Sequence, residues 1–422
     1  MLVNKKKDMT PFDMKRPPMK QKWYLMPLLW GGSWLMTRRF GLKIHKMNMK
    51  NFKPPYLVLS THQGFSDYYI APLALFPHRA NYVSDMEGFA AFGEWLYRAI
   101  GCIGKRRYVS DYSVVKNIKL ALKDKQSVVI FPESRHSNVG TTAYLPENLG
   151  KLVKSMGVPL VILSVHGSYL ANPFWDEEHT RRTPMEATLE GVYTTQEVLE
   201  LSAQEIQKTI EEKLQYDEYK WQRENQIPIT EKNRAEGLHK ALYQCKACKS
   251  EYCMKSKGSQ LYCEKCGAKW EMTELGMLQR IAIPDWYEWQ RAEVIRQIEQ
   301  GGYEASYVVT VEALPNAKGF VPLGEGRLIH REEGFTLEVG QETLVFEHAT
   351  RESVQTEYNY RHKGMGIVLS TRDCCYYIYS KDVAFQPTKI QFVGEYFYKE
   401  GKRKSESKGI GSAGRSVFAE RI

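Results

Sequence analysis

The chain has 422 residues, of which 43% are hydrophobic and 26% are charged, a composition typical of a globular protein with two or three domains. No apolar stretch reaches the roughly 18 residues that a membrane-spanning helix needs, and the basic start of the chain is not followed by a signal-peptide cleavage pattern. With few cysteines, half of them clustered in pairs, the sequence favours a reducing cytoplasm over secretion.

Positive charge is concentrated at the start of the chain. Residues 1–55 hold thirteen Lys and Arg against two Asp, so this segment accounts for the whole net charge of +10. A basic segment of this kind favours an anionic partner, either a membrane surface or a nucleic acid. Within it, we expect residues 1–22 to form a disordered basic arm.

Residues 23–36 are apolar and rich in tryptophan. They are too few to span a bilayer, but their length and their basic flanks suit burial at a membrane interface, where Trp is favoured and cations meet anionic head groups. The alternative is a core helix of the first domain. The flanking cations, which favour the membrane interpretation, are Lys20, Lys22, Arg38 and Arg39.

A short apolar run at residues 56–60 predicts a buried strand, and residues 68–76 predict the helix that follows it. His62 would leave the strand and Asp67 would begin the helix, so the turn can bring the carboxylate to the imidazole. A carboxylate on one ring nitrogen fixes the tautomer and leaves the other nitrogen free as a base. The same residues are compatible with a helix-capping Asp67 and an ordinary loop histidine.

The next predicted strand covers residues 79–84 and the next helix residues 88–100. A glycine-punctuated turn then leads into Lys105, Arg106 and Arg107. Adjacent cations at such a turn could hold a phosphate, with arginine giving a two-point grip. A solvated basic loop is the alternative.

Residues 111–125 have helical spacing, residues 127–131 predict a strand, and Glu133 and Arg135 follow that strand. A further helix is expected at residues 147–156 and a buried strand at residues 158–165. The alternation predicts an α/β domain with a largely parallel or mixed sheet. Since sites in such sheets gather at the carboxyl ends of strands, we expect His62, Glu133 and Arg135 to share one site.

Four motifs occur in a recognisable order: His-x-x-x-x-Asp (62–67), Gly-x-Ile-x-x-Arg (101–106), Phe-Pro-Glu (131–133) and Val-Pro-Leu (158–160). Over roughly residues 30–215 this order resembles the glycerolipid acyltransferase family, which includes the 1-acylglycerol-3-phosphate acyltransferases. The resemblance implies an acyltransferase domain at residues 23–235 with His62 and Asp67 as catalytic residues. It further implies that Arg106 binds the acceptor phosphate, with Arg107 as a possible substitute, and that Glu133 shapes the pocket or orients a cation.

The sequence departs from the family pattern at four positions. Thr61 stands where the family usually has Asn, and Ser134 where it has Gly. Arg135 takes the place of Thr, and His136 that of Arg. The shifted cation makes Arg135 a further candidate for the phosphate and leaves the acceptor open.

Residues 194–225 are charged and have helical spacing, which predicts a helix that closes the first domain. The pattern Cys-x-x-Cys follows twice, at Cys245 and Cys248 and at Cys263 and Cys266. Two such pairs suit a tetrahedral Zn²⁺, so we predict a zinc ribbon at residues 240–275 with a structural metal. The segment between residues 240 and 270 is basic, with seven Lys and two Glu, which is compatible with either a spacer or a recognition module.

After a linker helix at residues 284–300, residues 303–400 contain several β-rich runs and a final helical stretch at 387–399. This pattern predicts an all-β domain and resembles that of a pleckstrin-homology-like barrel. Residues 401–422 are expected to be a disordered tail.

The functional hypothesis is acyl transfer from acyl-CoA or an acyl carrier protein to a hydroxyl of a lysophospholipid, without an acyl-enzyme. The enzyme would lie in the cytoplasm, at the surface of the membrane. The alternative is a catalytically weak protein that binds lipid or nucleic acid through the ribbon and the β domain, with nucleic acid the less favoured partner. A serine hydrolase using Ser134 or Ser168 lacks the Gly-x-Ser-x-Gly turn.

Overall fold

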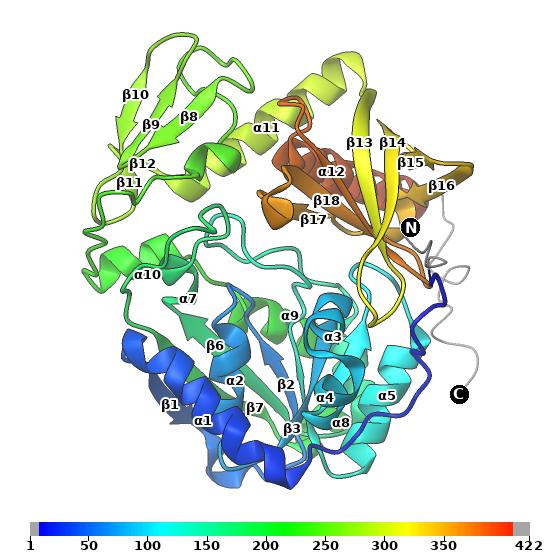
Figure 1. Cartoon of the computed structure of the whole chain (residues 1–422). Helices are drawn as coiled ribbons and strands as arrows, with labels where there is room; N and C mark the ends of the chain where they lie inside the picture. Colours follow the sequence, from blue (N-terminus) through cyan, green and yellow to red (C-terminus); the bar gives the residue numbers. More distant parts are fainter. Residues whose placement is uncertain (1–7, 408–422) are drawn as a thin grey trace, which may run out of the picture.

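The computed structural model describes residues 8–407. In Figure 1 an α/β domain (residues 23–235) occupies the lower half, and the ribbon and the C-terminal β domain (residues 303–407) lie above it.

The α/β domain is built on a seven-stranded sheet with the order β1-β7-β6-β2-β5-β3-β4. Neighbouring strands are parallel except at the β6–β7 pair, so β7 and β1 run against the other five. This confirms the predicted mixed, largely parallel sheet. The strands are β1 (Lys43–Met47), β2 (Leu57–Ser60), β3 (Ala80–Asp85), β4 (Cys102–Lys105), β5 (Ser127–Ile130), β6 (Leu160–His166) and β7 (Glu186–Tyr193).

Helices cover both faces of this sheet because successive side chains of the central strands point to opposite sides. Leu57 and Leu59 of β2 pack in one core with α5, α6 and α9, whereas Val58 packs in a second core with α2. The helices are α1 (Met26–Thr37), α2 (Asp67–Leu75), α3 (Met86–Phe92), α4 (Glu94–Ala99), α5 (Tyr112–Lys123), α6 (Leu149–Met156), α7 (Ser168–Ala171), α8 (Thr195–Glu200), α9 (Ala203–Lys213) and α10 (Glu218–Glu224).

Two helices predicted as continuous are divided. The helix expected at residues 88–100 breaks at Gly93, whose φ of 82° lies in the left-handed region. The helix expected at residues 194–225 is α8, α9 and α10. Thr194 and Ser202 each begin a new helix with a capping box, in which a Glu three residues later completes the reciprocal hydrogen bonds.

The segment predicted as a ribbon (residues 240–275) contains a three-stranded sheet of β8 (Met254–Lys257), β9 (Gln260–Cys263) and β10 (Lys269–Glu271). A two-stranded hairpin of β11 (Met277–Leu278) and β12 (Ile281–Ala282) follows it and leads into the long helix α11 (Ile283–Gly301), at the position of the predicted linker helix. The buried ribbon side chains Leu261 and Trp270 join one hydrophobic core with Tyr219 of α10 and Trp286 of α11. The ribbon is therefore packed onto the rest of the molecule.

The C-terminal domain is an antiparallel half-barrel with the strand order β16-β15-β14-β13-β19-β18-β17, which confirms the predicted all-β domain. Its likeness to a pleckstrin-homology domain stays a prediction. The strands are β13 (Ala305–Leu314), β14 (Val321–Arg331), β15 (Gly334–Val339), β16 (Glu342–Glu347), β17 (Gln355–Glu357), β18 (Met365–Ser370) and β19 (Cys375–Ser380).

Helix α12 (Pro387–Ser407) follows these strands. It begins where the final helix was predicted but continues beyond residue 399, so residues 401–407 of the expected disordered tail are helical. The remainder of that tail, residues 408–422, lies outside the described residues.

The N-terminal arm is packed where the structure describes it, and the prediction of disorder is wrong for residues 8–22. Phe12 is buried against Phe89 and Arg98, and its N–H donates to the carbonyl of Pro315 in the β domain (2.9 Å). The Gln21 amide donates to the Ile100 carbonyl and accepts from the N–H of Ala80. The charge of this segment favours disorder, but Phe12 and Gln21 contact residues far along the chain and so order it. Residues 1–7 lie outside the described residues.

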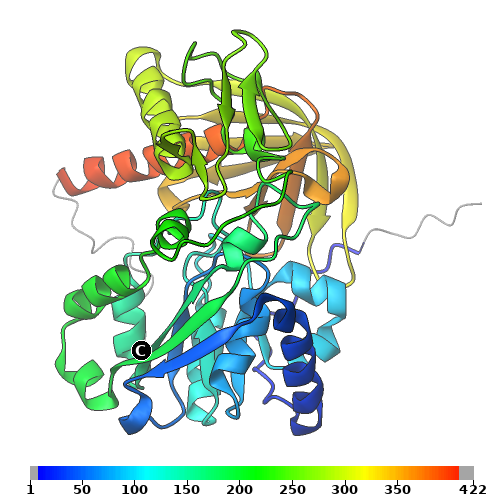
Figure 2. The same ribbon diagram turned by 90° about the vertical axis from the view of Figure 1, so that its left-hand side faces the viewer.

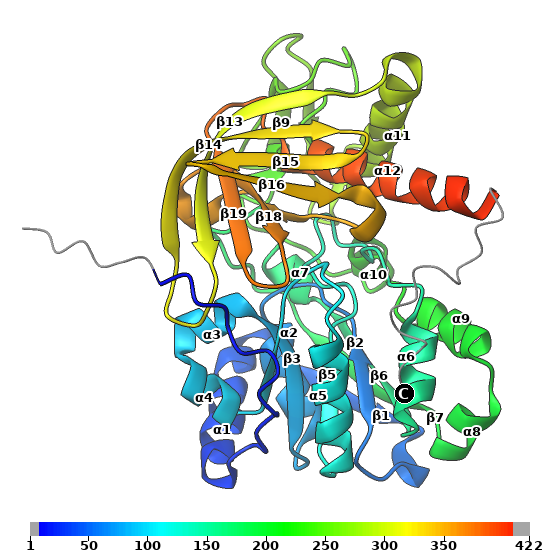
Figure 3. The ribbon, with the colours of Figure 1, turned by 90° about the vertical axis from the view of Figure 1, so that its right-hand side faces the viewer.

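The β domain meets the α/β domain at the edge where the parallel strands end, as Figures 1 and 3 show. Asn138, which follows β5, donates to Tyr287 of α11 (2.9 Å) and to Gln391 of α12 (2.7 Å), and it accepts from Thr356 of β17 (3.0 Å). The C-terminal half thus lies over the carboxyl ends of the strands.

Candidate active site and metal centre

The turn between β2 and α2 brings His62 and Asp67 together, with Nδ1 of the imidazole 3.3 Å from Oδ2 of the carboxylate. Both side chains are buried. The same oxygen accepts the backbone N–H groups of Gln63 (2.6 Å) and Gly64 (3.0 Å). Three donors therefore hold Asp67 against the imidazole ring.

The environment fixes the protonation states of this pair. Burial, together with the nearby Arg107 guanidinium, lowers the pKa of His62 to about 3, so the ring is neutral at pH 7. Burial raises the pKa of Asp67 to about 6, which leaves it largely ionised at pH 7. The ring proton then belongs on Nδ1, facing the carboxylate, and Nε2 is left as a proton acceptor. This is the arrangement that a general base requires.

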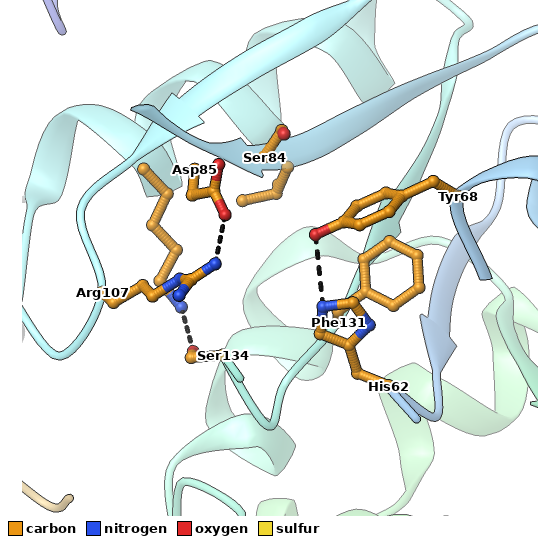
Figure 4. Close-up of a pocket in the computed structure, with 9 residues that line it drawn as sticks. His62, Tyr68, Ser84, Asp85, Arg107, Phe131 and Ser134 are labelled. Carbon is orange, nitrogen blue, oxygen red and sulfur yellow. Dashed lines mark hydrogen bonds and ion pairs between the residues drawn. The ribbon is translucent and has the colours of Figure 1, made fainter. Parts of the chain in front are cut away.

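A tyrosine hydroxyl already faces that acceptor nitrogen. Oη of Tyr68 lies 3.2 Å from Nε2 of His62, as the dashed line in Figure 4 marks. On the other side, Phe131 packs against the imidazole with ring centroids 4.5 Å apart. The base is thus held between an aromatic ring and a phenol.

His62 opens onto a small cavity of about 30 Å³, room for roughly two water molecules. Two cations face it from the end of β4. Arg107 forms an ion pair with Asp85, and Lys105 donates to Oγ of Ser134 (2.6 Å). The cavity is lined by His62, Tyr68, Val83, Ser84, Asp85, Lys105, Arg107, Phe131 and Ser134.

Arg106 does not lie in this cavity, which corrects its predicted role. Its guanidinium donates to three backbone carbonyls of the β domain, those of Arg372 (2.6 Å), Asp373 (3.0 Å) and Pro315 (3.2 Å). The reason is the alternation of side chains at the end of a strand. Lys105 and Arg107 point to the cavity, so Arg106 between them points away from it.

The structure also places Arg135 elsewhere. Its buried guanidinium lies 3.8 Å from Glu395 of α12 and donates to the carbonyl of His136 (3.2 Å). It faces the C-terminal helix, so the expectation that it helps to bind an acceptor phosphate does not agree with its position.

Glu133 contacts the backbone that carries the base, not a cation of the cavity. One carboxylate oxygen accepts the N–H of His62 (2.8 Å), and the other accepts the N–H of Ala143 (2.7 Å) and the hydroxyl of Tyr216 (2.9 Å). Burial raises the pKa of this carboxyl to about 7. These hydrogen bonds tie the His62 turn to Ala143 and Tyr216.

Ser134 adopts a left-handed backbone conformation, with φ of 59°. A side chain in this region costs about 1 kcal/mol, which explains why glycine suits this position. In this chain the Ser134 hydroxyl accepts a hydrogen bond from Lys105 and so holds that cation at the cavity.

Sequence reasoning missed Tyr68, Ser84 and Asp85 as site residues, and it considered Lys105 only as one of three adjacent cations that could hold a phosphate. Two signals could have found some of them. Asp85 ends β3, so it belongs to the same edge of the sheet as His62. Lys105 stands two positions before Arg107, the spacing that puts strand side chains on one face. The orientation of Tyr68 had no such signal.

The four predicted cysteines come together in the ribbon, and their sulfur atoms all lie within 4.8 Å of one another. The distance from Cys245 to Cys266 is 3.7 Å and that from Cys248 to Cys263 is 3.8 Å. A tetrahedral ion with metal–sulfur bonds of about 2.3 Å separates its ligands by about 3.8 Å. The four residues therefore fit a metal ion.

Comparison with known proteins assigns part of the chain. Residues 41–166 match the model of the Acyltransferase family. Among solved structures, the chain is similar to the 1-acyl-sn-glycerophosphate (LPA) acyltransferase PlsC from Thermotoga maritima, with 18% identity, a TM-score of 0.36, and coverage of 45% of this chain and 76% of that chain. A search of curated proteins found no match. Residues 41–166, which hold His62, Asp67 and the cavity around them, are an acyltransferase domain.

Proposed function

We propose that the chain is an O-acyltransferase of the glycerolipid type, which moves a fatty acyl group from acyl-CoA or an acyl carrier protein to a hydroxyl of a lysophospholipid such as 1-acylglycerol-3-phosphate. The observation that carries this proposal is the neutral, buried His62, whose Nε2 faces a cavity with two cations. The match of residues 41–166 to the Acyltransferase family supports it.

In this mechanism, Nε2 of His62 takes the proton of the acceptor hydroxyl as its oxygen attacks the thioester carbonyl. The tetrahedral intermediate then collapses, the carbon–sulfur bond breaks, and the imidazolium returns the proton to the leaving thiolate. Asp67 stabilises the imidazolium between these steps. The acyl group passes directly to the acceptor.

The phosphate of the acceptor would bind to Arg107 and Lys105. Both face the cavity that contains the base, and arginine can hold two phosphate oxygens at once. Their present partners, Asp85 and Ser134, keep the two cations in place until an anion arrives.

A membrane surface would supply the lipid substrates. Helix α1 is not a core helix, because only Met26, Ser33 and Thr37 of its residues are buried. Trp23 is 75% exposed and Trp34 is 58% exposed. A second exposed apolar group, Phe92, Trp95 and Leu96, lies on α3 and α4.

Figures 2 and 3 show α1 and the α3–α4 pair on the same side of the α/β domain. Close to this side, the N–H of Lys22 donates to Ala99 at the end of α4. Within residues 8–407, no helix has the length and apolar character needed to cross a bilayer. We therefore propose peripheral binding, from the cytoplasmic side, through both groups and the basic flanks of α1.

The ribbon cysteines would hold a structural Zn²⁺. The hydrophobic core shared by the ribbon, α10 and α11 favours a structural role over a separate recognition module. No observation favours the binding-only alternative, and the intact pair of His62 and Asp67 counts against it.

Replacement of His62 by alanine should abolish transfer. In mixed micelles with a radiolabelled acyl-CoA or acyl carrier protein and a panel of lysolipids, we expect the wild type to acylate one acceptor and His62→Ala to lose at least roughly 10²-fold in rate, the scale of general-base catalysis. His45→Ala, an exposed histidine of β1, is the matched control. Wild-type protein that acylates no lysolipid with either donor would refute the proposed function.

Substitution of Arg107 should weaken substrate binding, whereas substitution of its neighbour Arg106 should lower the stability of the fold. Arg107→Gln should raise KM for a phosphate-bearing acceptor about tenfold to a hundredfold, the value of one or two charge-assisted hydrogen bonds. It should change KM for monoacylglycerol, which has no phosphate, very little, so the ratio of the two KM values should rise. Arg106→Gln should instead lower the urea midpoint of unfolding and leave that KM ratio unchanged, because its partners are carbonyls of the β domain. An equal effect of both variants on KM would contradict the assignment.

Membrane binding should depend on the exposed tryptophans. Trp34→Ser combined with Trp95→Ser should weaken binding to anionic vesicles, measured by co-sedimentation, by at least about 10²-fold, because each buried aromatic contributes about 1.5–3 kcal/mol. The control is Tyr112→Ser combined with Leu199→Ser, two exposed residues of α5 and α8. Equal binding of both double variants would exclude this surface.

The purified protein should contain about one zinc ion per chain by elemental analysis. Cys263→Ser should lose this zinc and lower the melting temperature, because a small ribbon gains folding energy from its metal. Cys253→Ser, outside the cluster, should retain both. Zinc that survives the Cys263 substitution would place the metal elsewhere.

A further inference from the structure

The hydroxyl of Tyr68 stands where the acceptor hydroxyl must come. Tyr68 follows Asp67 in the first turn of α2, and its ring meets that of His62 edge-on, with centroids 5.3 Å apart. Its Oη is 3.2 Å from Nε2, the only ring nitrogen not facing Asp67. Figure 4 shows the phenol of Tyr68 pointing toward the imidazole of His62.

The direction of this hydrogen bond follows from the protonation states. Neutral His62 carries its proton on Nδ1, so Nε2 is an acceptor with a single in-plane lone pair. Burial raises the pKa of Tyr68 well above its usual value, so the phenol keeps its proton and donates it to Nε2. One lone pair accepts one well-aligned donor. The acceptor hydroxyl, or a water molecule, must therefore displace Tyr68 before His62 can activate it.

Water is the relevant competitor in this site. The cavity beside Tyr68 is large enough for roughly two water molecules. A water activated by His62 would attack the thioester carbonyl, the carbon–sulfur bond would break, and the products would be a free fatty acid and a thiol. The imidazole would pass the proton of the water to the leaving thiolate. This hydrolysis wastes the donor, and it needs the same base as transfer.

We propose that Tyr68 is a positioning residue that occupies the general base in the resting enzyme and withholds it from water until the acceptor displaces the phenol. The proposal rests on the proposed acyl transfer. Lys105 and Arg107 face the same cavity, so an acceptor held there by its phosphate brings its hydroxyl to Nε2 at high local concentration. A water molecule has no such anchor, and it competes with Tyr68 unaided.

Tyr68→Phe tests the proposal, because it keeps the ring and removes the hydroxyl. With acyl-CoA alone, release of free thiol should rise about tenfold in this variant, and the rise should disappear in Tyr68→Phe combined with His62→Ala. Transfer at saturating acceptor should fall less than about threefold. Tyr69→Phe, the next residue of α2, is the matched control and should change neither rate.

The pH dependence of hydrolysis distinguishes this proposal from a purely structural role of Tyr68, because only the loss of a hydrogen bond to Nε2 would shift it. Donation from Tyr68 favours the unprotonated form of Nε2, so its removal should shift the acid limb of the hydrolysis profile to higher pH. The ¹⁵N resonance of the His62 imidazole should titrate at a correspondingly higher pH in Tyr68→Phe, and this measurement needs no substrate.

Each other outcome decides against the proposal. A loss of transfer of about 10²-fold with unchanged hydrolysis would make Tyr68 a proton relay. Unchanged hydrolysis, transfer and ¹⁵N titration would leave Tyr68 without a role at the base. If the wild type acylates no lysolipid, the proposed function fails, whereas the ¹⁵N titration still decides whether Tyr68 occupies Nε2.

Discussion

The candidate active site depends on one buried carboxylate, that of Glu133. It accepts hydrogen bonds from the His62 backbone, from the Ala143 backbone and from Tyr216, so it joins the ends of β2 and β5 to two segments further along the chain. A carboxylate removed from water is costly unless its oxygens are satisfied, and here three donors satisfy it. A catalytic group must be held within fractions of an ångström, and Glu133 holds the backbone of His62, the proposed general base.

The carboxyl edge of the sheet serves two purposes at once. His62, Lys105 and Arg107 face the cavity, whereas Arg106 and Arg135 hold the C-terminal half over it. Alternation along the backbone divides neighbouring residues between these tasks. Arg106, which the sequence suggests as a phosphate-binding residue, is thus a contact between the two domains in the structure.

The elements with strong local patterns were predictable from the sequence. The buried strands β2, β5 and β6 and the meeting of His62 with Asp67 follow from apolar runs and from the turn between strand and helix. The capping boxes that divide residues 194–225 were also visible, as Thr194 with Glu197 and Ser202 with Glu205, although the charged periodicity suggested one helix.

Other features could not be predicted because their causes are distant in the sequence. The partners of Arg106 are about 210 to 270 residues away, so no local pattern distinguishes it from Arg107. The burial of Phe12 depends on Phe89 and Pro315 in the same way. Strand β1, with its mostly exposed side chains, lacks the apolar signal that marks the central strands.

The N-terminal arm has a consequence for how the chain is made. Its docking site includes the carbonyl of Pro315 and the amide of Asn316, which donates to Thr10 (2.7 Å). The ribosome produces the arm roughly 300 residues before these partners. The arm is therefore made well before its docking site is complete, and Phe12 can take its final place only after Pro315 has been added to the chain.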